Sequence, residues 1–165
     1  NLMASVAVAK CIRNLSGIQG DLIVGKEILI KGKKVCGILA EMAAEMDAIN
    51  FVNLGIGINV NSSVSHFEKG ATSLKDELGK EVSRKELLSL VLAEINQQQD
   101  LLTKGDLLQE WKNLSATLNK QVRIVAPGEE IVGEAIDIDT NGALLIKSAD
   151  GSLKSAIAGD CIYLR

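Results

Sequence analysis

Two glycine-bearing apolar segments constrain the fold of this chain more than any other feature. They are Lys33-Lys-Val-Cys-Gly-Ile-Leu-Ala-Glu41 and Asn53-Leu-Gly-Ile-Gly-Ile-Asn-Val-Asn61. Nearly unbroken apolar residues predict buried strands, and glycines within strands let a second backbone or a ligand come close. Two adjacent strands of this kind would form the floor of a pocket, with Lys34 as the cation at its rim and Asn59 as a polar anchor. A small, mostly apolar ligand with one negative group would suit that lining.

The residues around these two segments predict a sheet built from hairpins. Residues 21–31 predict two short strands, or one strand bent at Gly25, and Lys31-Gly32-Lys33 predicts a turn into the first glycine-bearing strand. The small and polar run 42–47 predicts the next turn, and residues 49–60 predict the next strand. Because that connection is short, the two glycine-bearing strands should run antiparallel.

Helical periodicity accounts for most of the other residues in the first two thirds of the chain. Apolar residues recur at helical spacing over 2–15, and Gly17 suits a C-terminal cap. Ser83-Arg-Lys-Glu86 is a capping box for a helix that should end near Leu102. Shorter helices are predicted over 73–78 and 107–114, and Trp111 in the second is interpreted as a core residue.

From Lys120 the pattern changes to short β-rich runs separated by strong turn signals such as Asn141-Gly142 and Asp150-Gly151. Five short strands in about 45 residues predict a small barrel of the SH3-like kind. The sequence therefore predicts an α+β fold in two domains, a mixed sheet backed by helices over 1–117 and an SH3-like β-barrel over 118–165. The five strands are expected at 121–126, 130–139, 143–148, 153–158 and 161–164.

Composition argues against several classes of function. The net charge is −3, basic residues are scattered and aromatic residues make up 2%, so nucleic-acid binding is not expected. No apolar run reaches about 18 residues, so no membrane span is expected. Three distant cysteines fit neither a disulfide framework nor a Cys-x-x-Cys metal site, which suits a reduced cytoplasm. The single histidine, His66, is expected to be a solvated loop residue, and no metal site is predicted.

The glycine-bearing segments match none of the common nucleotide-binding or hydrolytic motifs. Gly55-Ile-Gly-Ile-Asn-Val60 lacks a third glycine and precedes a loop, which argues against a dinucleotide site. The sequence contains no Walker loop and no recognisable Ser-His-Asp set. On these residues alone two interpretations stay open. One is a ligand pocket, and the other is a pair of solvated hairpin lysines beside glycines that merely ease the packing.

The order of the two segments and the short gap between them resemble the core of the biotin protein ligases. Ala71-Thr-Ser-Leu74, the amphipathic helix after it and the small all-β tail extend the resemblance over nearly the whole chain, as the later part of a complete ligase. The resemblance implies that biotin and ATP, accompanied by Mg²⁺, condense to biotinyl-adenylate. The biotinyl group would then pass to a lysine of a biotin carboxyl carrier protein.

The resemblance also implies roles for individual residues. Lys34 matches the catalytic lysine that contacts the biotin carboxylate and the phosphate, where a fixed ammonium offsets developing negative charge. Gly37 and Leu39 match the backbone and the apolar wall against the biotin rings. Gly57 and Asn59 match positions on the nucleotide side.

Two departures from the family pattern bear on activity. The family carries Lys-Trp-Pro-Asn-Asp before the hairpin, whereas this chain has Ile23-Val24-Gly25-Lys26-Glu27 in register. The glycine- and arginine-rich loop that folds over the adenylate has no counterpart within residues 1–165. We therefore expect little adenylation by this chain alone, with Lys26 as a candidate second cation for the phosphates.

Three hypotheses follow, and the first leads. The chain is the later catalytic segment and C-terminal domain of a biotin protein ligase. Alternatively, it is a degenerate homologue that binds biotin or a carrier protein without catalysis, or a ligase for another acyl acid. The cysteine pattern favours a cytoplasmic location, and the resemblance implies a homodimer formed through sheet edges.

Overall fold

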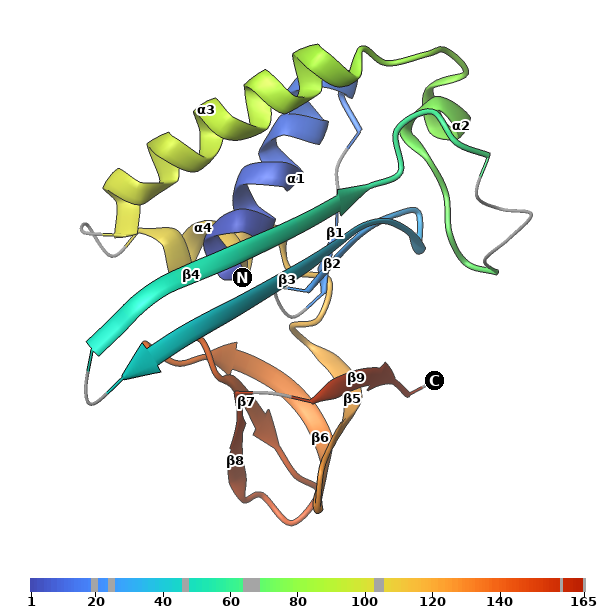
Figure 1. The fold of residues 1–165 in the computed structure, drawn as a ribbon. Coiled ribbons are helices and arrows are strands. Elements are labelled where there is room, and N and C mark those ends of the chain that lie inside the picture. The colour runs from blue at the N-terminus through green and yellow to red at the C-terminus, as the bar shows by residue number, and fades with distance from the viewer. Residues whose placement is uncertain are drawn as a thin grey trace.

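The structure is a computed structural model that describes residues 1–18, 21–23, 26–45, 48–63, 69–102, 106–157 and 159–164. A β-sheet with helices packed on it forms the larger part, and a second, all-β part lies below it in Figure 1. The elements, in chain order, are α1 (Leu2–Ser16), β1 (Asp21–Ile23), β2 (Glu27–Ile30), β3 (Lys33–Glu45), β4 (Ala48–Ile58), α2 (Leu74–Leu78), α3 (Arg84–Leu102), α4 (Leu107–Leu114), β5 (Lys120–Ala126), β6 (Glu129–Ile138), β7 (Leu144–Lys147), β8 (Leu153–Ala156) and β9 (Asp160–Tyr163).

The first sheet has the strand order β1-β2-β3-β4, and each neighbouring pair is antiparallel. Lys31 and Gly32 both have positive φ values, 52° and 77°, as a tight two-residue hairpin between β2 and β3 requires. One isolated parallel bridge joins Lys34 to Ala71. Helices α1, α3 and α4 pack behind the sheet (Figure 1), and the inward residues Ile28 and Ile38 are buried with them in one core. The antiparallel arrangement of the glycine-bearing strands is thus confirmed.

The hairpin between β3 and β4 is longer than predicted. A turn over 42–47 was expected, but β3 continues to Glu45 and β4 begins at Ala48, with these two residues paired. The alanines at 43 and 44 are small rather than turn-forming, and neither Gly nor Pro interrupts the ladder there. The prediction was therefore wrong for 42–45, while residues 46–47, Val24-Gly25 and His66 lie outside the described part of the chain.

Helix ends follow the sequence signals. The N–H of Gly17, at φ 70°, donates to the Arg13 carbonyl and closes α1. Ser73 Oγ accepts from the Asp76 N–H at 3.1 Å and starts α2, and Gly79 ends that helix in the left-handed region. None of the described helices is both long enough and apolar enough to cross a membrane.

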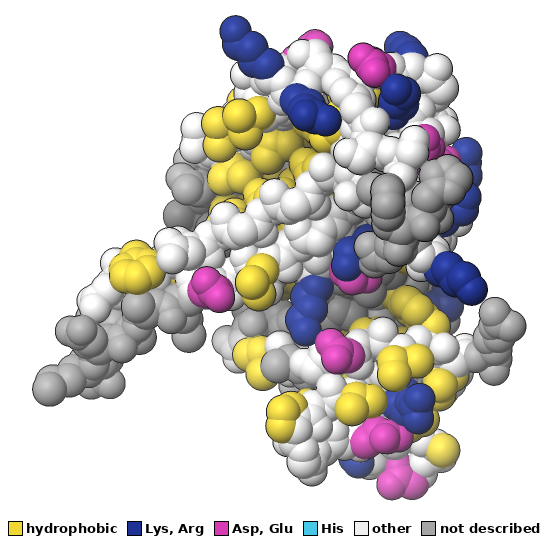
Figure 2. Space-filling view, turned by 45° about the vertical axis from the view of Figure 1, so that its right-hand side comes forward, with side chains coloured by type: hydrophobic (Ala, Val, Ile, Leu, Met, Phe, Trp, Pro, Cys, Tyr) yellow, Lys and Arg dark blue, Asp and Glu magenta, His cyan; other side chains and the backbone are white. Residues whose placement is uncertain are grey.

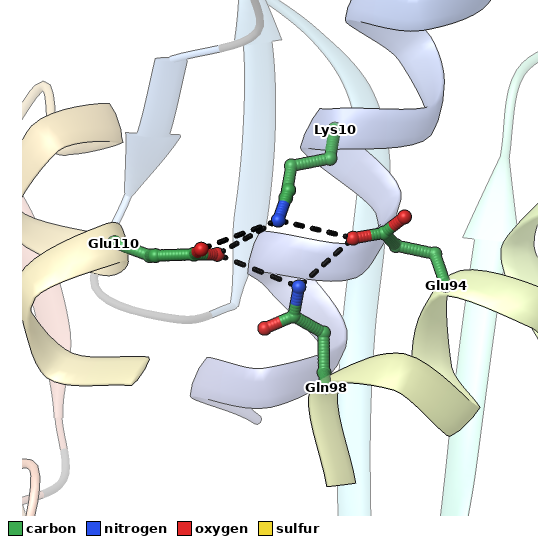
Figure 3. Close-up of polar contacts among 4 residues, drawn as sticks. All are labelled: Lys10, Glu94, Gln98 and Glu110. Carbon is green, nitrogen blue, oxygen red and sulfur yellow. Dashed lines mark hydrogen bonds and ion pairs between the residues drawn. The ribbon is translucent and has the colours of Figure 1, made fainter. Parts of the chain in front are cut away.

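A polar cluster ties α1, α3 and α4 together (Figure 3). The Lys10 ammonium lies 3.2 Å from a Glu94 oxygen and 3.0 Å from a Glu110 oxygen. The buried Gln98 amide donates to Glu94 Oε1 at 2.8 Å. Burial alone would lower the pKa of Lys10, but the hydrogen bonds to Glu110 and Glu94 outweigh it and raise that pKa. These ion pairs and hydrogen bonds hold the three helices together, in addition to their apolar packing.

The second sheet has the order β8-β7-β6-β5-β9, with all neighbours antiparallel, and forms the SH3-like domain that the turn signals predicted. No pairing between β8 and β9 closes it among the described strands. Gly133 is required by close packing, because a Cβ there would overlap the Lys147 carbonyl.

The two sheets share one continuous apolar core. Val122, Ile124 and Leu144 of the second sheet belong to the same cluster of buried residues as Ile12 of α1. Trp111 of α4 is fully buried in that cluster, which confirms its predicted role as a core residue. The core thus fixes the position of the second sheet relative to the first.

Candidate functional site

An open pocket of about 480 Å³ lies where β2, β3 and β4 run side by side, on the side of the sheet away from the helices. The exposed side chain of Leu39 marks that side, since 61% of its surface is accessible. The lining residues come from the predicted site and from the preceding strand: Lys26, Glu27, Lys34, Gly37, Ile38, Leu39, Gly55, Ile56 and Gly57.

Glycines form the floor of the pocket. Gly37 pairs with Gly57, and Leu39 pairs with Gly55, across the two long strands. A Cβ on Gly57 would lie 3.9 Å from the Gly37 carbonyl oxygen, which is ordinary contact, so packing within the sheet does not demand this glycine. What the glycines provide is bare backbone over which a flat ligand can lie.

A β-bulge turns Lys34 toward that floor. Leu29 pairs with Lys34, whereas Ile28 pairs with Cys36, so β3 carries one extra residue, Val35, at this point. In a regular strand Lys34 would share the inward side with the buried Cys36. The bulge instead buries Val35 and places Lys34 with Gly37, whose Cβ position lies 3.5 Å from Lys34 Cε.

The Lys34 ammonium is held by a carboxylate of the neighbouring strand. Its Nζ lies 2.8 Å from Glu27 Oε1, and both side chains are a little over one third exposed. The backbone of Lys34 is fixed as well, because its N–H donates to Gly70 O at 2.7 Å and its carbonyl accepts from the Thr72 N–H at 2.9 Å. The cation is thus oriented, and part of the Lys34 side chain is exposed at the pocket that it lines.

Asn59 does not line this pocket. Its side-chain amide donates to the Thr72 carbonyl at 3.1 Å, and its own carbonyl accepts from the Leu74 N–H at 2.9 Å. Asn61 likewise exchanges two 2.9 Å hydrogen bonds with the backbone of Val82. Asn59 and Asn61 therefore hold the backbone of the segments that follow β4. Of the predicted site residues, the structure brings Lys34, Gly37, Leu39 and Gly57 together in the pocket.

Lys26 and Glu27 also line the pocket, although the sequence indicated Glu27 only as part of a departure from the family pattern and Lys26 as a candidate second cation for the phosphates. The Lys26 ammonium donates to the Gly159 carbonyl at 3.0 Å and lies 4.0 Å from Asp160 Oδ1, so it reaches the second sheet. Glu27 pairs with Gly37 across β2 and β3. Pairs counted outward from the Lys31-Gly32 turn bring Glu27 close to Gly37, so the sequence did carry a signal for this lining residue.

The cysteines are poor nucleophiles at neutral pH. Burial raises the pKa of Cys36 to about 12, against a smaller opposing effect of Lys34. Burial also raises the pKa of Cys11 and of Cys161 to about 11. Thiolates are therefore scarce at neutral pH. Within the described ranges, no three or more His, Cys, Asp or Glu side chains are arranged to hold a metal ion.

Comparison with known proteins finds a matching family model and several similar proteins. Residues 117–164 match the family model described as the biotin protein ligase C terminal domain. The bifunctional ligase/repressor BirA of Bacillus subtilis is 34% identical over 160 residues, covering 93% of this chain and 49% of that protein. The biotin--[acetyl-CoA-carboxylase] ligase of Mycobacterium tuberculosis is 33% identical over 171 residues, covering 100% and 62%.

Solved structures of a biotin protein ligase share the fold of this chain. A crystal structure of the biotin protein ligase from Aquifex aeolicus superimposes with a TM-score of 0.83 at 25% identity, covering 99% of this chain and 73% of that one. The same protein in complex with biotin and ATP shares the fold, with a TM-score of 0.81 at 24% identity over 99% and 70% of the two chains. The chain thus spans about half the length of the Bacillus relative. In its fold, its C-terminal domain and its sequence, this chain matches the C-terminal part of the biotin protein ligase family.

Proposed function

We propose that this chain supplies the biotin pocket of a biotin protein ligase. The reaction would activate biotin with ATP as biotinyl-adenylate and transfer the biotinyl group to a lysine of a biotin carboxyl carrier protein. Because the chain spans 49% of the Bacillus relative, we assign the whole reaction to a complete catalytic unit rather than to residues 1–165 alone. The names of the relatives and the Aquifex complex with biotin and ATP support this assignment.

The observation that carries the proposal is the orientation of Lys34. A bulge turns its side chain over the glycine floor, and Glu27 holds the ammonium at 2.8 Å. An ammonium at the mouth of a pocket with apolar walls suits a ligand that ends in a carboxylate. The exposed Leu39 side chain would lose contact with water against a ring system, which favours binding.

The first chemical step would use that cation. A biotin carboxylate oxygen attacks the α-phosphorus of ATP, a new O–P bond forms, and the bond to the β-phosphate breaks as pyrophosphate leaves. Negative charge accumulates on the α-phosphoryl oxygens, and the ammonium of Lys34 would offset it. In the second step, the neutral amine of the carrier lysine attacks the acyl carbon, AMP leaves, and the amine releases a proton.

The remaining predicted residues take supporting roles. Gly37 and Gly57 would let the ligand lie against bare backbone, with Leu39 as the wall of the biotin site. We propose that Asn59 acts on the nucleotide side by positioning, since its amide fixes the segment at Thr72 that bonds the backbone of Lys34. Lys26 is directed to the second sheet instead of the phosphates.

Further proposals come from the family alone. Mg²⁺ would accompany ATP, held by the phosphates, since the described residues offer no cluster of metal ligands. We also propose a cytoplasmic location and a homodimer of the completed protein.

Pyrophosphate release tests the reaction. The chain should be assayed with biotin and ATP, alone and after addition of the part of the Bacillus relative that precedes its match to this chain. We expect little release by the chain alone and turnover in the completed form, which Lys34→Met should reduce strongly. Turnover that ignores Lys34→Met would overturn the role of this residue. Turnover with lipoate or octanoate but not with biotin would identify a ligase for another acyl acid, and none in any form would favour a binding protein.

A further inference from the structure

The side chain of Lys26 joins the pocket to the second sheet. Lys26 directly precedes β2, and it lines both the open pocket and a cavity of about 190 Å³ that is bordered by α1 and the second sheet. Its ammonium donates to the Gly159 carbonyl at 3.0 Å. Figure 2 shows basic and acidic side chains gathered where the larger part of the molecule meets the second sheet. A polar contact of the C-terminal domain therefore lies at the rim of the candidate site.

Gly159 is a fixed point of the second sheet. Its φ is 125°, and a Cβ there would lie 2.7 Å from Ile124 Cγ2 and 2.9 Å from the Val125 carbonyl oxygen. The next residue, Asp160, begins β9 and pairs with Val125 of β5. Because the backbone of Gly159 lies directly against β5, its carbonyl moves only when the second sheet moves.

The backbone of Lys26 connects this fixed point to the cation of the pocket. The Lys26 carbonyl accepts from the Ile38 N–H at 2.7 Å, which ties it to β3. The following residue, Glu27, begins β2, and its carboxylate lies 2.8 Å from Lys34 Nζ. The start of β2 is thus held by strand pairing on one side and by the side chain of Lys26 on the other. A displacement of Gly159 would reach the Lys34 ammonium through Lys26 and Glu27.

We propose that Lys26 is a positioning residue through which the C-terminal domain orients the Glu27–Lys34 pair of the pocket. The proposal rests on the proposed function of Lys34, but the coupling itself requires no ligand. Because the second sheet already engages its ammonium, Lys26 acts on the ligand only through Glu27 and Lys34. An ammonium that is held in place before the reaction stabilises developing negative charge without first having to reorient.

Side-chain NMR of the full chain with ¹³C-labelled lysine tests the coupling without a ligand. The two Hε protons of a lysine held in one orientation differ in chemical shift, and they become equivalent when the side chain rotates freely. In Lys26→Met the shift difference at Lys34 should fall toward its value in Glu27→Gln, whereas Lys26→Arg, which keeps a cationic donor, should preserve it. Lys112→Met is the matched control. It removes a 2.7 Å ion pair with Asp137 that also joins the two parts of the chain, but neither of these residues lines the pocket.

Calorimetry with a non-hydrolysable biotinyl-adenylate analogue completes the test. The Lys26 side chain is 47% exposed, so Lys26→Met should weaken binding by only about threefold. It should have no further effect once Glu27→Gln is present, because both changes act through the same pair.

Three results would overturn the proposal. They are an unchanged Lys34 resonance in Lys26→Met, equal effects of Lys26→Met and Lys112→Met, and an additive loss in the double variant, which would show that Lys26 acts on the ligand directly. An unchanged affinity of Lys34→Met would refute the proposed function alone, since the lysine resonances report the coupling in the ligand-free chain.

Discussion

Replacing Lys34 by Met should separate ligand binding from folding. Methionine keeps most of the aliphatic length over Gly37 but removes the ammonium that pairs with Glu27 at 2.8 Å. Both partners are a little over one third exposed, so the pair contributes at most about 1 kcal/mol to the free energy of unfolding. The Glu27 carboxylate left behind can be solvated from the open pocket. The midpoint of thermal unfolding should therefore change by only a few degrees.

Ligand affinity should respond far more strongly. A charge-assisted hydrogen bond from an ammonium to a carboxylate or phosphate contributes about 1.5–3 kcal/mol. Lys34→Met should therefore raise the dissociation constant for a non-hydrolysable biotinyl-adenylate analogue by about ten- to a hundredfold. Isothermal titration calorimetry on the folded variant would measure this ratio directly.

Lys33→Met is the matched control for that measurement. It removes the same charge from the adjacent position, but Lys33 is exposed and does not line the pocket. The control should bind the analogue within about twofold of the unchanged chain, since salt screens the effect of an exposed charge that lies outside the pocket. Equal losses in both variants would show that Lys34 acts only through the general field of the hairpin, and an unchanged affinity of Lys34→Met would refute its place in the site.

Three further predictions concern stability and domain structure. Gly133→Ala should destabilise the second sheet by about 1–3 kcal/mol in urea unfolding, because the added Cβ overlaps the Lys147 carbonyl; an unchanged midpoint would contradict that packing. Asp137→Asn should cost about 0.5 kcal/mol at neutral pH, since Lys112 Nζ lies 2.7 Å from Asp137 Oδ1 in a partly exposed pair. The hydrogen bond from Lys112, followed by that from the Ile138 N–H, lowers the pKa of Asp137, so this contribution is present above the ordinary pKa and is lost as pH falls through the lowered one. A difference between variant and unchanged protein that grows at acid pH would refute that assignment. Residues 118–165 should give the circular dichroism of a folded β domain as an isolated fragment, although they share a core with α1, and a random-coil spectrum would place the boundary elsewhere.

Local signals in the sequence were sufficient wherever one residue type decides the backbone. Gly142 and Gly151 have φ values of 81° and 82°, which few other residues adopt, and each lies in a predicted turn. The caps at Ser73 and Gly17 are of the same kind. Secondary structure in these regions therefore follows from single residues with strong preferences.

The candidate site depended on features that no single residue encodes. Lys-Lys-Val-Cys does not reveal which residue is extra in β3, because the bulge exists only relative to the partner strand β2. Asn59 could serve a ligand or a backbone, and its partner, Thr72, lies in a separate segment that bonds alongside Lys34. The length of the β3–β4 hairpin is likewise a property of a pair of strands, since residues 42–45 have no strong preference of their own.

The departure at Ile23–Glu27 has a more specific meaning in the folded chain than in the sequence. Glutamate replaces the aspartate of the family pattern, yet its carboxylate reaches the ammonium of Lys34, so the pairing of a carboxylate with this lysine is available despite the altered segment. Lys26, which the sequence suggested as a second cation for phosphates, instead donates to Gly159 of the second sheet. The two adjacent residues thus have different roles. Glu27 orients the Lys34 ammonium in the pocket, and Lys26 connects the rim of the pocket to the C-terminal domain. A change at Lys26 should consequently act on the contact between the two sheets before it acts on the charge presented to the ligand.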